Sequence, residues 1–205
     1  MIDPVVIGTA FVTIVVVELP DKTFIATLVL GTRFRPLLVW LGVGLAFALQ
    51  TGIAVALGKA ATFLPTTLVQ GAAVLLFLAG AVLLFVEARR QGRGEDADPT
   101  DEGEEYAARA GSARGGLSAV GASFLVLFAA EWGDLSQLLT LSLVARYDDP
   151  VGVFVGALAA LLTVSGLAIL VGRALLQRVG LRTLHYAGAT VCLVLASLTL
   201  WELLS

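Results

Sequence analysis

The sequence predicts an all-α polytopic membrane protein with six transmembrane helices, arranged as two inverted three-helix repeats. Three observations predict this fold: an apolar composition, six long apolar runs, and one polar motif that occurs twice. Of the 205 residues, 58% are hydrophobic and 14% are charged, and the mean hydropathy is +0.94. In soluble domains about a quarter of the residues are charged. We therefore expect almost no soluble mass.

Six segments are long and apolar enough to cross a bilayer, which takes about 20 residues of helix. They are residues 5–30, 36–58, 66–87, 117–145, 151–172 and 183–203.

A polar segment, residues 89–115, separates the third apolar run from the fourth. It reads RRQGRGEDADPTDEGEEYAARAGSARG, and its glycine, proline and acidic content is typical of a flexible linker. The sequence thus predicts a first three-helix repeat at 1–88, an acidic linker at 89–115, and a second, inverted repeat at 116–205.

Basic residues predict how the chain is oriented. With six spans, ten arginines fall on the side of the linker, whereas Lys59 and Arg146 fall on the side of the termini. Cytoplasmic loops carry the excess of basic residues. We therefore expect a cytoplasmic linker and both termini outside, with the protein integral to a bacterial inner (plasma) membrane.

The repeated motif is E-x-x-D-x-[ST]. The first copy lies in VVVELPDKTF at 15–24, and the second lies in FAAEWGDLSQ at 128–137, 113 residues later. The likeness continues into the following helix, where Gly42 corresponds to Gly156. Chance similarity of apolar helices does not account for shared carboxylates, so we predict an internal repeat. Because each copy has three helices, the second enters the membrane from the opposite side.

Four carboxylates of the motifs are expected near the middle of the membrane: Glu18, Asp21, Glu131 and Asp134. Acidic side chains at that depth are costly and mark functional sites. The spacing of three residues predicts that the two acids of each motif share one helix face. If the repeats face each other, the four carboxylates converge.

The motifs also predict interrupted helices. Pro20 lacks the N–H that bonds residue i−4, so the first helix should kink or break there. Gly133 is the softer counterpart in the second copy. Discontinuous helices of this kind form ion sites in many transporters.

Carboxylates with nearby hydroxyl groups favour a hard divalent cation such as manganese, calcium or magnesium. Five residues are candidates for neutral oxygen ligands: Thr23, Thr27, Ser136, Gln137 and Thr140. Lys22 is a candidate for holding part of the negative charge in the empty site. The one histidine, one cysteine and one methionine of the chain lie outside the motifs. Clustered carboxylates repel one another, so protons replace a departing cation.

Four further polar residues lie on the second and fifth apolar runs: Gln50, Thr51, Thr163 and Ser165. We interpret them as helix-packing groups. The alternative is that they line the same cavity as the carboxylates.

ELPDKT and EWGDLSQ resemble the paired E-x-G-D-[KR]-[ST] signatures of a cation/proton exchanger family. This family was once listed as uncharacterised protein family 0016 and includes the human Golgi transmembrane protein 165. The resemblance covers essentially the whole chain. It implies six helices in two inverted repeats, and manganese and calcium transport in exchange for protons, with bacterial members exporting manganese. Pro20 and Leu135 depart from the signatures but remove no carboxylate.

By this resemblance, Glu18, Asp21, Glu131 and Asp134 would be cation ligands. Thr23, Ser136 and Gln137 would be auxiliary groups.

The sequence therefore predicts a secondary-active antiporter that exports manganese, or calcium, from the cytoplasm against protons. We expect a transporter and not an enzyme, with the cation and protons as its only small-molecule partners and no cofactor. The lipid bilayer is the other partner, no nucleic acid is expected, and a homo-oligomer is compatible with the sequence. Alternatives are an exporter of small amino acids or other metabolites and, in another class, an intramembrane enzyme or a membrane assembly factor.

Overall fold

The described part of the chain is entirely helical outside its turns, which confirms the predicted all-α class. The computed structural model describes residues 3–19, 22–61, 63, 65–91, 108, 116–178 and 181–204. Eight helices lie within these ranges: α1 (Pro4–Glu18), α2 (Lys22–Arg33), α3 (Pro36–Ala61), α4 (Thr66–Gln91), α6 (Leu117–Ala130), α7 (Leu135–Tyr147), α8 (Pro150–Arg178) and α9 (Leu181–Leu204).

Three of these helices, α3, α4 and α8, are each long and apolar enough to cross a membrane. The pairs α1–α2 and α6–α7 are bent by 73° and 72°, and they bring the candidate spans to five if each pair is one span. In α9 the described apolar stretch is Ala189–Trp201, which is shorter. Helices of this length and hydropathy are typical of an integral membrane protein. The arrangement of six spans in inverted repeats stays a prediction.

Both predicted interruptions occur at the motifs. Helix α1 ends at Glu18 and α2 begins at Lys22, while α6 ends at Ala130 and α7 begins at Leu135. The predicted first and fourth spans are therefore each two shorter helices. Most of the predicted 89–115 linker lies outside the described residues.

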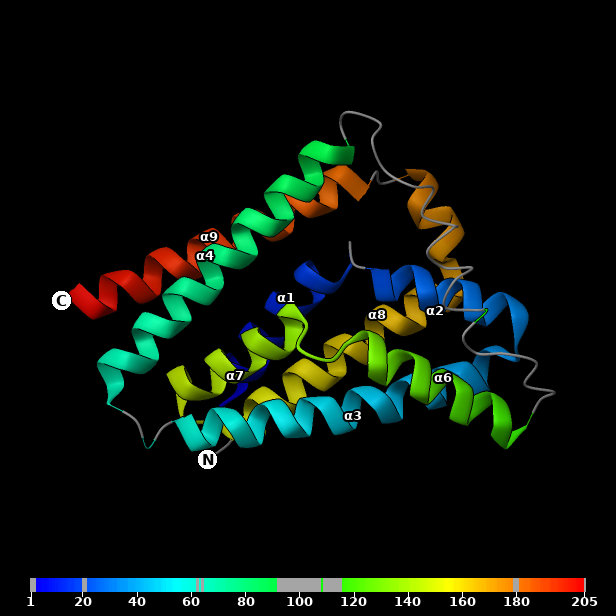
Figure 1. The fold of residues 1–205 in the computed structure, drawn as a ribbon, viewed down its shortest axis with the longest axis horizontal. Helices are drawn as coiled ribbons and strands as arrows, with labels where there is room; N and C mark the ends of the chain where they lie inside the picture. Colours follow the sequence, from blue (N-terminus) through cyan, green and yellow to red (C-terminus); the bar gives the residue numbers. More distant parts are fainter. Residues whose placement is uncertain are drawn as a thin grey trace.

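The helices of the two halves pack reciprocally. Helix α1 packs against α8 as α6 packs against α3, and α2 packs against α8 as α7 packs against α3. The pair α4–α9 takes one helix from each half, and Figure 1 shows these two helices running side by side along one edge. Exchanging the halves leaves these five contacts unchanged, as a two-fold relation would, whereas the contacts α1–α9 and α4–α7 have no comparable counterpart among the described helices.

Two glycines make the closest of these reciprocal contacts. A Cβ atom on Gly42 would overlap the carbonyl oxygen of Val120, and one on Gly156 would overlap that of Ile7. Small residues let helix backbones approach closely in membrane proteins. The glycines therefore set how near α3 comes to α6 and how near α8 comes to α1.

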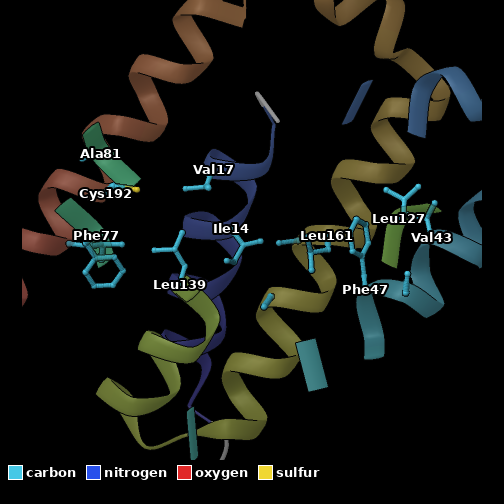
Figure 2. Packing of buried hydrophobic residues seen from close by; sticks show 14 of the residues in the cluster. Ile14, Val17, Val43, Phe47, Phe77, Ala81, Leu127, Leu139, Leu161 and Cys192 are labelled. Carbon is cyan, nitrogen blue, oxygen red and sulfur yellow. The ribbon is translucent and has the colours of Figure 1, made fainter. Parts of the chain in front are cut away.

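A continuous apolar core joins the α4–α9 pair to the broken helices. Figure 2 shows Val17 of α1 and Leu139 of α7 between Phe77 of α4 and Leu161 of α8. Phe77 and Leu139 are almost fully buried. The core thereby fixes both broken helices against unbroken ones, close to the points where they are interrupted.

Asp149, in the turn before α8, links the start of α8 to the start of α1. Its Oδ2 accepts a hydrogen bond from the backbone N–H of Asp3 at 2.9 Å, and its Oδ1 accepts one from the N–H of Gly152 at 2.9 Å. Asp3 is in turn the N-cap of α1. These backbone donors, the Asp3 N–H first, lower the pKa of the Asp149 carboxyl from its ordinary value of 3.8.

Alanine at Gly42 or Gly156 is expected to lower the free energy of unfolding, by about 1–3 kcal/mol, because its methyl group must push two helix backbones apart. The measurement is thermal unfolding of the detergent-purified variants. Gly121→Ala on α6 is the matched control, because nothing lies within 4 Å of a Cβ atom there. Equal melting temperatures for all three variants would contradict the packing.

Asp149→Asn is expected to lower the melting temperature at pH 7, because asparagine keeps one acceptor oxygen and its NH2 group cannot accept the second N–H. A carboxyl whose folded-state pKa is lowered stabilises the protein above its unfolded pKa. That contribution is lost as the pH falls below about 4, toward the folded-state pKa. Melting temperatures of wild type and variant should therefore converge in acid. Asp148→Asn, at the exposed neighbouring residue, should show no such convergence.

Candidate cation site

Three acidic side chains meet where the two broken helices approach each other. Glu18, Glu131 and Asp134 each offer one carboxylate oxygen, and these oxygens all lie within 4.8 Å of one another. Glu18 and Glu131 are each only 1% exposed. Glu18 comes from the first half of the chain and the other two from the second, so this cluster, hereafter the carboxylate cluster, lies between the halves.

The second interruption is a turn that brings Glu131 next to Asp134. Glu131 is the C-cap of α6 and Asp134 is the N-cap of α7, and the Asp134 N–H donates to the Glu131 carbonyl at 3.1 Å. Gly133 between them has φ = 78°, a conformation that glycine adopts without steric cost. The prediction that these two acids share one helix face is thus wrong, because the helix stops between them.

Hydrogen bonds hold the polar groups of the second motif in place. Oδ2 of Asp134 accepts from the Ser136 N–H at 3.3 Å, as an N-cap does. Oε1 of Gln137 accepts from the Gly133 N–H at 3.2 Å. Ser136 and Gln137, predicted as auxiliary groups, therefore lie at this turn.

A further hydrogen bond crosses the first interruption. Thr23 Oγ1, in the first turn of α2, donates to Oε1 of Glu18 at 3.3 Å, and both residues are buried. The structure thus brings together Thr23 and Glu18, as the motif suggested. Asp21, Pro20 and the side chain of Lys22 lie outside the described residues, so the roles predicted for them stay predictions.

A small pocket adjoins the carboxylate cluster on the side of α3 and α7. Its volume is about 10 Å³, which is the space of about one water molecule or ion. Its apolar wall is Phe47 and Leu161. Six polar residues line it: Gln50, Thr51, Glu131, Ser136, Gln137 and Thr140.

For Gln50 and Thr51 the structure therefore favours the alternative interpretation, that they line a cavity with a motif carboxylate. Thr163 and Ser165 donate their hydroxyl groups to carbonyls of their own helix at 2.7 and 3.1 Å, as expected for helix-packing residues. For Gln50 the sequence did contain a signal, because the hydrogen bonds of an amide in the middle of an apolar run are harder to satisfy than those of a hydroxyl. Thr51 carried no such signal.

Electrostatics restrict what the carboxylate cluster can hold. At an effective dielectric constant of about 20, two ionised carboxylates about 4.8 Å apart repel by about 3.5 kcal/mol. The three cannot all be charged at low cost unless positive charge joins them. Oxygen ligands on opposite sides of one calcium-sized cation are about 4.6–5.2 Å apart, so the observed separation of at most 4.8 Å fits a shared cation.

Helix ends add to the field at the cluster. Helices α1 and α6 end at Glu18 and Ala130, beside the cluster, and the C-terminal end of a helix carries partial negative charge that favours a cation. Helix α7 begins at the same place, and its N-terminal N–H groups stabilise the carboxylate of Asp134. The two interruptions thus place two helix C-terminal ends and one helix N-terminal end beside the cluster.

Comparison with known proteins gives one family. A family model described as the divalent cation/proton antiporter GDT1 matches residues 6–92 and 119–205. The two matched segments are equally long and 113 residues apart, the separation of the two motifs. No solved structure matches the chain.

Curated relatives give the same result. A GDT1-like protein of Synechocystis sp. is 31% identical over 193 residues, which cover 92% of this chain and 93% of that protein. The chloroplastic PAM71-homolog of Arabidopsis thaliana is 31% identical over 207 residues, covering 93% of this chain and 57% of that protein. The chloroplastic GDT1-like protein 1 of Oryza sativa subsp. indica is 30% identical over 213 residues, covering 97% and 62%. The chain thus spans about six-tenths of the two plant proteins.

Divalent cations are expected to stabilise the protein through the carboxylate cluster. A ligand at 100 times its dissociation constant adds about 2.7 kcal/mol to the free energy of unfolding. Glu131→Gln should lose most of this gain, because it removes one of the three charges while keeping the shape of the side chain. The measurement is thermal unfolding during titration with manganese chloride. Asp148→Asn is the control and should retain the wild-type response, whereas an equal response from Glu131→Gln would argue against the cluster.

Proposed function

The chain belongs to the GDT1 family of divalent cation/proton antiporters, and we propose that it exchanges manganese or calcium for protons at the carboxylate cluster. It is thus a transporter and not an enzyme. The observation that carries the proposed site is the approach of Glu18, Glu131 and Asp134 to within 4.8 Å of one another. We include Asp21 as a fourth ligand, by its place in the first motif.

Exchange follows from the charge of the cluster. Three carboxylates this close are neutralised either by a divalent cation or by protons, and each excludes the other. A transporter that opens this site alternately to the two sides then moves protons one way and the cation the other. No separate proton pathway is needed, because cation and protons compete for the same oxygens.

The inverted arrangement of two three-helix repeats is the architecture that we propose for alternating access. It is supported by the reciprocal packing of the two halves and by the equal spacing of the two family matches. Broken helices at the interface of inverted repeats form the ion sites of other secondary transporters. In this arrangement α9 is the sixth span, both termini lie outside, and the direction of transport is export from the cytoplasm of a bacterium.

We place manganese first and calcium second among the transported ions. The described donors are carboxylate, hydroxyl and amide oxygens, which suit manganese, calcium and magnesium. Thiolate and imidazole ligands, which favour zinc and copper, are absent from both motifs.

The test is proton movement in proteoliposomes that contain a pH-sensitive dye and receive a manganese or calcium gradient. Glu18→Gln and Asp134→Asn are each expected to reduce metal-driven proton movement to the rate of empty liposomes. Asp134→Asn is informative because asparagine also caps helices well, so α7 keeps its cap while the charge is removed. Competition among manganese, calcium and magnesium in wild type then gives the order of preference.

Asp148→Asn serves as the control, since this exposed carboxylate lies in the turn after α7 and outside the cluster. It should transport at the wild-type rate. Wild-type rates in both Glu18→Gln and Asp134→Asn would contradict the proposed site. Proton movement that is unaffected by any divalent cation would contradict the antiport itself.

A further inference from the structure

Gln50 of α3 is a buried amide whose two polar atoms have different surroundings. The side chain is 2% exposed, and Nε2 donates to the carbonyl oxygen of Phe128 at 2.9 Å. Phe128 lies in the last turn of α6, where carbonyls lack a partner within the helix. Because that acceptor requires an N–H donor, the nitrogen must face Phe128, and Oε1 is the atom left for another partner.

The amide also lines the pocket that contains Glu131. Gln50 and Gln137 both contribute to its wall, from α3 and α7, next to a carboxylate that belongs to the cluster. Glu131 is thus shared between the cluster and the pocket. A cation held by Glu131 would therefore lie beside a pocket whose wall includes the amides of Gln50 and Gln137.

The position that corresponds to each amide in the opposite half is apolar. Gln137 corresponds to Phe24 in the motif alignment, and Gln50 corresponds to Val164 in the alignment that pairs Gly42 with Gly156. Phe24 and Val164 belong to one buried hydrophobic cluster and are 1% and 2% exposed. The α3–α7 interface thus has a pocket with two amides, whereas the corresponding α2–α8 interface has packed hydrocarbon. The surroundings of the carboxylate cluster are thus one-sided, although the helix packing around it is reciprocal.

We propose that the pocket is a neutral-oxygen subsite for the transported divalent cation, and that Gln50 is its specificity-determining residue on α3. The role proposed for Gln50 rests on the proposed antiport, because a cation can contact the Gln50 amide only while the same cation is bound by Glu131. Calcium takes six to eight oxygen ligands, many of them neutral, whereas smaller cations are satisfied with six. An additional amide oxygen therefore favours the larger cation.

The experiment measures KM and kcat for calcium and for manganese in proteoliposomes, for wild type and three variants. Gln50→Met keeps the length of the side chain but has no amide, and is expected to raise KM for calcium about tenfold and more than KM for manganese. Gln50→Asn keeps an amide on a shorter side chain, and its affinity for calcium should lie between those of wild type and Gln50→Met. Gln70→Met is the matched control on α4, and it should keep both wild-type KM values.

The outcomes separate a ligand from a purely structural group. If Gln50 only satisfies the carbonyl of Phe128, then Gln50→Met lowers the melting temperature and kcat but leaves the ratio of the two KM values unchanged. That result would overturn the subsite. Glu18→Gln, measured in the same vesicles, separates the two proposals. Lost transport in Glu18→Gln with wild-type KM values in Gln50→Met overturns the subsite alone, whereas wild-type transport in Glu18→Gln overturns the proposed cation site.

Discussion

Mutual repulsion of buried carboxylates is the constraint on which the centre of this protein depends. One carboxylate oxygen each of Glu18, Glu131 and Asp134 lies within 4.8 Å of the others, with Glu18 and Glu131 buried and Asp134 partly buried. Such a cluster is stable only when positive charge neutralises it, whether as a cation or as protons. The interrupted helices add to this constraint, because the C-terminal ends of α1 and α6 bring further partial negative charge to the cluster, and the N-terminal end of α7 opposes it only at Asp134.

The interruptions depend in turn on the unbroken helices beside them. Helices α3 and α8 each pack against the broken helices of the other half, and Gly42 and Gly156 allow that approach through nearly identical contacts. A helix broken in the middle of a membrane loses hydrogen bonds that water cannot replace. The neighbouring helix replaces some of them, as the Gln50 amide does for the Phe128 carbonyl.

Reciprocal packing coexists with unequal chemistry. The two halves have the same order of helices and the same motif, yet Gln50 and Gln137 line a pocket while Val164 and Phe24 pack in hydrocarbon. Divergence at these positions does not disturb helix packing, because amide, valine and phenylalanine all fill space beside a helix. It changes which oxygens lie beside Glu131, and therefore what a bound cation would contact.

The helical class, the two places where helices are interrupted and the carboxylates to consider could all be predicted from the sequence, because hydropathy, proline, glycine and intramembrane charge act locally along the chain. The folded structure was needed to see that Glu131 and Asp134 meet across a turn and not on one helix face. It was also needed to see that Gln50 and Thr51 line a pocket with Glu131, while Thr163 and Ser165 bond to their own helix. These outcomes depend on how helices distant in sequence rotate and cross as they pack, and periodicity within a single helix does not specify that geometry.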